Sequence, residues 1–164
     1  MRALVALTVL GGGMAQATVA PALRIGDVLP DLPLIVVVLL ALRRGPEFGC
    51  LAGFAAGLLQ DAAGGGLIGV QALTKALAGF AVGTLGGELR VTQPLVQVPG
   101  LAVLTIVEGL LRFGLLKLFH FEVPFGELML YVVMPQALYN GFLGAACVLA
   151  VELAHTLRDR QTWI

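Results

Sequence analysis

The side chains of this sequence that are suited to acid–base or ionic chemistry lie inside long apolar runs. The strongly polar ones are Asp61, Gln71, Lys75, Glu108, Arg112 and Gln136. Gln71 and Lys75 are four residues apart, as are Glu108 and Arg112, so each pair lies on one face of a helix. One interpretation is a structural network, in which Glu108 pairs with Arg112 or Lys75 and the amides complete the hydrogen bonding. The other is a polar cavity that opens outward and receives a lipid headgroup, a small molecule or a partner segment.

Catalytic residue patterns are missing from the sequence. It contains no serine, no paired aspartates and no His-Glu-x-x-His motif, whereas an enzyme needs a nucleophile within hydrogen-bond reach of a base. Cys50 and Cys147 lie in apolar runs without metal-ligand spacing, and His120 and His155 are expected near opposite membrane faces. We therefore expect no enzymatic activity, no metal and no cofactor.

The composition indicates that lipid is the solvent for most of the surface. Apolar residues make up 59% of the chain, charged residues 12%, and the mean hydropathy is +0.97. A soluble domain carries roughly 25% charged residues. The apolar residues come in runs and not in alternation, and in hydrocarbon every backbone polar group must be satisfied internally, so we expect an all-α integral membrane protein. The formal net charge is +0 and no Lys/Arg run exists, so no nucleic-acid partner is expected.

Six transmembrane helices are expected in a single domain that covers residues 1–164. Their approximate ranges are 3–20, 31–42, 47–60, 67–87, 95–119 and 125–157. Asp61 is expected to end the third helix on its outer side. Pro135 is expected to kink the last helix, because proline removes a backbone hydrogen bond. The first helix resembles a cleavable secretory signal, but a chain that is apolar throughout needs no separate signal, and we expect the helix to be retained.

The basic residues predict the orientation, because they are enriched on the cytoplasmic side of membranes. If the N-terminus lies in the cytoplasm, the basic residues on that side are Arg2, Arg43, Arg44, Arg90, Arg158 and Arg160. Arg24 and Lys117 then lie outside. Both termini are therefore expected in the cytoplasm.

Glycines recur at helical spacing in two places. The first stripe is Gly45, Gly49, Gly53 and Gly57, and the second is Gly79, Gly83 and Gly87. Such stripes let another helix approach closely. We expect them to pack inside the bundle; the alternative is that one stripe receives a helix from another protein.

Residues 29–85 resemble the MreD family of bacterial rod shape-determining membrane proteins. The resemblance rests on Pro-Asp before a short apolar helix, the turn "ALRRGP", a Gly-x-x-x-Gly-x-x-x-Asp ending, and "GLIGVQAL" before a glycine-spaced helix. It implies a six-helix bundle similar to the substrate-binding subunits of energy-coupling-factor vitamin transporters.

The resemblance also implies a function. It indicates a non-enzymatic scaffold in the bacterial cytoplasmic (inner) membrane, within the complex that elongates the cell wall and determines cell shape. The implied partner is MreC, which has one membrane helix and an external domain, and through it RodA and its class B penicillin-binding protein. The alternative is a membrane subunit that binds a lipid or a small solute in an outward-facing polar cavity.

Overall fold

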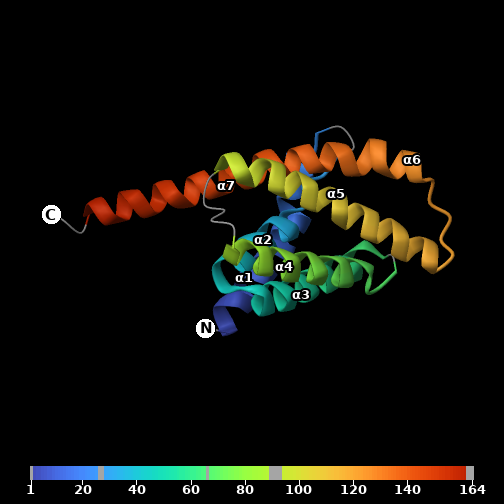
Figure 1. Cartoon of the computed structure of the whole chain (residues 1–164), viewed down its shortest axis with the longest axis horizontal. Coiled ribbons are helices and arrows are strands. Elements are labelled where there is room, and N and C mark those ends of the chain that lie inside the picture. Colours follow the sequence, from blue (N-terminus) through green and yellow to red (C-terminus); the bar gives the residue numbers. More distant parts are fainter. Residues whose placement is uncertain (1, 26–27, 66, 89–93, 162–164) are drawn as a thin grey trace.

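The part of the chain that the structure describes is helical. The computed structural model describes residues 2–25, 28–65, 67–88 and 94–161 (Figure 1). The elements are α1 (Arg2–Thr18), η1 (Ala20–Leu23), α2 (Leu32–Arg44), α3 (Pro46–Gly64), α4 (Val70–Glu88), α5 (Pro94–Leu118), α6 (Phe125–Glu127), η2 (Leu128–Val133) and α7 (Met134–Gln161). These residues contain no strand, so the predicted all-α class is confirmed. The similarity to vitamin-transporter subunits stays a prediction.

The helices form two groups. The helices α1 to α4 pack together, and α5 packs along α7 on one side of them (Figure 1). The C-terminal turns of α7 extend away from the other helices (Figure 1). Fewer contacts join the two groups than hold each one together, and they run mainly from α4 to α5. Whatever fixes the two groups relative to each other must therefore act through a small contact area.

The helices α3 and α4 form an antiparallel hairpin in which the two backbones approach closely. A Cβ added at Gly49 would collide with the backbone of Gly79, and one at Gly53 with the backbone of Lys75. Likewise, Gly57 lies against the backbone of Gln71. Glycine allows this backbone-to-backbone approach because it has no side chain to separate the helices. We call this contact the α3–α4 seam.

Two glycines of the predicted stripes, Gly45 and Gly87, differ from the others. Gly45 was expected in the first stripe, but it lies in the turn between α2 and α3, with a φ of 87° and open space where a Cβ would be. Its N–H ends α2 by donating to the carbonyl of Ala41, and its backbone lies against Gly83. Gly87 is the last glycine of α4, and its surroundings lie outside the described residues.

The last three elements form one continuous helical stretch with an irregular turn. The segment η2 is a π-helix that ends just before Pro135, and the N–H of Met134 donates to the carbonyl of Met129. Proline has no N–H for the regular helical bond, and π-bulges are a known way to absorb such a break. The irregularity predicted at Pro135 is therefore a π-helical segment on its N-terminal side.

The surface of the bundle carries many exposed apolar side chains. Leu51 and Phe54 on α3 and Leu77 and Phe80 on α4 are each about half exposed or more. Among the described residues, the stretch Phe125–Cys147 is long and apolar enough to cross a membrane. Exposed apolar faces of this extent are expected where the neighbouring molecules are lipids or other membrane helices.

The α5–α6 connection contains a non-glycine residue in the left-handed region. His120 has a φ of 63°. Its N–H donates to the carbonyl of Lys117 at 3.0 Å, and the N–H of Phe121 donates to the carbonyl of Leu116 at 2.9 Å. These two bonds form a Schellman cap, in which the left-handed position is usually glycine.

We predict that Gly53→Ala destabilises the protein by about 1–3 kcal/mol, because the new methyl group forces α3 away from α4. Gly64→Ala in the same helix is the control, since a Cβ there meets nothing within 4 Å. The measurement is the Tm of the purified protein in detergent. Equal Tm values for the two variants would show that the α3–α4 seam does not need glycine.

A second prediction concerns the cap of α5. His120→Gly should stabilise the protein by about 1 kcal/mol, because it removes the steric cost of a side chain in the left-handed conformation. His120→Ala keeps that cost and removes only the imidazole, so its Tm should not rise. A Tm increase in both variants would instead assign the effect to the imidazole.

Candidate functional site

Asp31 is the first component of a buried polar site. It lies immediately before α2, is 4% exposed, and caps this helix by accepting a hydrogen bond from the N–H of Leu34 on Oδ1 at 3.0 Å. Aspartate is favoured at this position because its side chain satisfies a backbone N–H that the first helical turn leaves free. The same oxygen also accepts from the amide of Gln60 at 3.3 Å. The cap leaves Oδ2 available for another donor.

Lys75 on α4 provides that donor and is fully buried at 0% exposure. Its Nζ lies 2.6 Å from Asp31 Oδ2 and 2.8 Å from Glu108 Oε1 on α5. It also donates to the side-chain oxygen of Gln71 at 3.0 Å. An ammonium group has three N–H donors, and all three are used. We call Asp31, Gln71, Lys75 and Glu108 the ionic cluster.

The ionic cluster continues into hydroxyl and amide contacts. The hydroxyl of Thr74 lies 3.3 Å from Glu108 Oε1. On the α7 side, Asn140 is fully buried; its Oδ1 accepts from the backbone N–H of Asp31 at 2.9 Å, and its Nδ2 donates to the Thr105 hydroxyl at 3.2 Å. These bonds extend the ionic cluster to α7, so that α2, α4, α5 and α7 all contribute to one polar site.

Two further side chains of α7 bind the segment that precedes α2. Gln136, which the sequence placed in the polar network, donates to the backbone carbonyl of Leu29 at 3.0 Å, and among the described residues no hydrogen bond joins it to the ionic cluster. Tyr139 donates its hydroxyl to the carbonyl of Leu23 at 2.6 Å. The segment that carries Asp31 is therefore attached to α7 by side-chain hydrogen bonds.

Asp61 has a different role from the one predicted. The sequence placed it at the end of the third helix, but α3 continues to Gly64. Its carboxylate accepts hydrogen bonds from the N–H groups of Gly69, Gln71 and Ala72 at 2.7–3.1 Å. A carboxylate is favourable there because the first N–H groups of a helix are free and the helix dipole is positive. Asp61 therefore caps α4 and lies outside the ionic cluster.

Arg112 was one of the two partners that the sequence offered Glu108. It lies one turn beyond Glu108 on α5 and is partly buried. Of the two partners that the sequence offered Glu108, the structure provides Lys75. Within the described residues, no hydrogen bond or ion pair involves the Arg112 guanidinium.

Asp31, Thr74, Thr105 and Asn140 were not among the predicted site residues. A signal existed for Asp31, because an aspartate before a short apolar helix with proline in its first turn is a helix-start pattern. That pattern predicts the cap but not the ion pair with a lysine 44 residues further along the chain. For Thr74, Thr105 and Asn140, the sequence shows only that they lie within apolar helices, which does not predict their partners.

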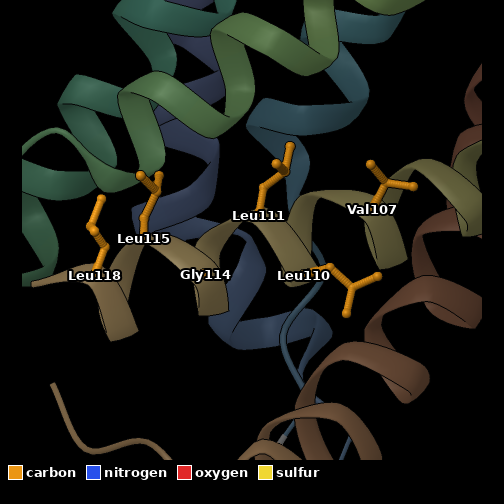
Figure 2. A pocket seen from close by; sticks show the side chains of 6 residues that line it. All are labelled: Val107, Leu110, Leu111, Gly114, Leu115 and Leu118. Atoms are coloured by element: carbon orange, nitrogen blue, oxygen red, sulfur yellow. The ribbon is translucent and has the colours of Figure 1, made fainter. Parts of the chain in front are cut away.

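A cavity of about 390 Å³ lies beside α5 (Figure 2). Its lining is Val107, Leu110, Leu111, Gly114, Leu115 and Leu118. None of the polar side chains predicted as a site lines this cavity. Among the described residues, no cluster of His, Cys, Asp and Glu side chains has a metal-binding arrangement. The polar groups of the ionic cluster bind one another, and the open space of this cavity is apolar.

Comparison with known proteins gives one match. The family model described as "rod shape-determining protein MreD" matches residues 2–156. No curated protein and no solved structure matches the chain.

We predict that removing the cation of the ionic cluster is more harmful than neutralising one carboxylate. Lys75→Met keeps much of the side-chain volume but leaves two buried carboxylates without their ammonium, and should destabilise the protein by about 3–5 kcal/mol. Glu108→Gln keeps an oxygen for Lys75 and leaves a one-to-one pair with Asp31, so its cost should be under about 1.5 kcal/mol. Unfolding of the two purified variants in detergent measures the difference. Equal losses would contradict this assignment of roles.

Proposed function

The chain belongs to the MreD family of rod shape-determining proteins, and from this membership we propose that it is a non-enzymatic membrane scaffold of the bacterial cell-wall elongation complex. The observation that carries the proposal is the family match, which covers residues 2–156 of the 164 in the chain. Membership places the chain in a family of membrane proteins that act in rod shape determination. The scaffold role and the partners below are our proposal.

The proposed partner is MreC, which would contribute its single membrane helix. Gly49, Gly53 and Gly57 face α4 within the chain, so they do not offer a groove to another protein. The MreC helix must therefore pack against exposed apolar side chains, such as those of Phe54 and Leu77. Through the external domain of MreC, the chain would be connected to RodA and its class B penicillin-binding protein.

The ionic cluster supports a scaffold role because it holds two helix groups in one arrangement. Lys75 bridges Asp31 before α2 and Glu108 on α5. A scaffold that positions a partner must keep its contact faces in a fixed relation, and buried polar contacts are one way to select a single arrangement of helices. In this proposal the residues of the ionic cluster hold the helices in position and take part in no reaction.

We predict that MreC co-purifies with this chain from native membranes in a fixed ratio and cross-links to one face only. Cys50 and Cys147 are replaced by alanine, and single cysteines are introduced at exposed positions of different helices, for example Phe54, Leu77 and Leu138. A cysteine at the fully buried Ala52 is the control and should give no cross-link. Absence of co-purification, or equal cross-linking from every exposed face, would contradict the proposal.

A further inference from the structure

The apolar cavity beside α5 has a regular lining. Val107, Leu110, Leu111, Gly114, Leu115 and Leu118 follow the helical spacing of three and four residues, so they form one stripe along the helix. Figure 2 shows Leu111, Leu115 and Leu118 directed to the same side of α5. Leu118, the last residue of α5, is 69% exposed. We call this feature the α5 groove.

Two cations flank the α5 groove. At 100° per residue, Lys117 lies about 20° beyond Leu110 at one edge of the stripe, and Arg112 lies about 60° beyond Leu115 at the other. Lys117 is exposed, and its Nζ lies 5.8 Å from the centre of the Phe113 ring. Neither side chain lines the groove itself, so its lining is apolar and the two positive charges lie beyond its edges.

Arg112 is the unusual member of this pair. It is partly buried, and the described residues provide no acceptor for its guanidinium. Glu108, one turn away, is bound by Lys75. A guanidinium has five N–H donors, and leaving donors without acceptors in an apolar environment is costly. An acceptor from outside the described chain would remove that cost.

We propose that the α5 groove binds an anionic phospholipid. An acyl chain lies along the stripe from Val107 to Leu118, and the lipid phosphate accepts hydrogen bonds from Arg112. Arg112 lies six residues before the end of α5, about 9 Å along the axis, a depth from which a long side chain reaches the headgroup region. Lys117, one residue before the helix end, adds attraction for the same charge.

The chemistry of the groove favours a phospholipid over an apolar partner helix. A guanidinium binds phosphate oxygens in a bidentate arrangement, which an apolar helix does not supply. Gly114 lies in the middle of the lining, and a Cβ there would meet nothing within 4 Å. This open position leaves room for a flexible chain. The lipid is held at an apolar groove, in contrast to the outward-facing polar cavity considered from the sequence.

The experiment uses the purified full chain, without MreC, and compares phosphatidylglycerol with phosphatidylcholine carrying the same acyl chains. Native mass spectrometry counts the lipids that stay bound. We expect the protein to prefer phosphatidylglycerol. Arg112→Gln should lower its apparent affinity about tenfold, the loss expected for a charge-assisted hydrogen bond. Arg112→Lys should give a smaller loss, because it keeps the charge without the bidentate geometry.

A matched glycine pair tests the groove itself. Gly114→Leu fills the groove from open space and should weaken the binding of both lipids. Gly100→Leu is the control, because Gly100 also lies on α5 with nothing within 4 Å of a Cβ and does not line the groove. Gel filtration and circular dichroism verify that each variant is folded.

Several results would overturn the proposal. It fails if Arg112→Gln or Gly114→Leu binds phosphatidylglycerol as the unchanged protein does. If Arg112→Gln does not fold, equal binding by Arg112→Lys overturns it. Inorganic phosphate at millimolar concentration should not displace the lipid, and displacement would indicate a simple anion site. If MreC displaces the bound lipid, the groove belongs to a partner helix and the proposal is wrong, while the scaffold function stands.

Discussion

The arrangement of this bundle depends on one buried ammonium group. Lys75 has no exposed surface, and its three N–H donors are directed at Asp31, Glu108 and Gln71. A charge buried among apolar helices is tolerated only when it is paired and fully hydrogen-bonded. The carboxylate before α2 and the carboxylate on α5 must therefore both reach the same point on α4. This requirement fixes the group α1 to α4 against α5 and, through Asn140, against α7.

The glycines of α3 make this position of Lys75 possible. Gly53 lies against the backbone of Lys75, and Gly57 lies against the backbone of Gln71. The α3–α4 seam therefore covers the backbone of α4 at Gln71 and Lys75, whose side chains belong to the ionic cluster. Because no side chains separate α3 and α4, the two helices pack closely, and Asp61 on α3 fixes the end of the pair next to their connection by capping α4. The periodic glycines and the polar side chains, which look like separate features in the sequence, therefore act on the same helix.

The sequence predicts the features that depend on local periodicity. The all-α class, the glycine-mediated packing inside the bundle and the polarity of Gln71, Lys75 and Glu108 follow from spacing and composition. The pairing of charges does not, because Lys75 reaches Asp31 and Glu108 across 44 and 33 residues of chain. The neighbour at helical spacing, Arg112, was an equally reasonable partner for Glu108. Asp61 and Gln136 were identified as polar, but the sequence named no partner for them, because their partners are backbone groups of other elements.

The two helix groups are joined through charged side chains because the surrounding solvent is lipid. In lipid, apolar side chains gain little by moving from hydrocarbon to a neighbouring helix, so close packing and hydrogen bonds must provide the specificity of association. The α3–α4 seam uses the first of these means, and the junction between the two helix groups uses the second. Exposed leucines and phenylalanines can then face lipid or a partner helix without affecting the fold. The interior contacts thus determine the shape of the bundle, while the exposed faces remain available for binding. This division is suited to a protein whose proposed function is to hold other membrane components.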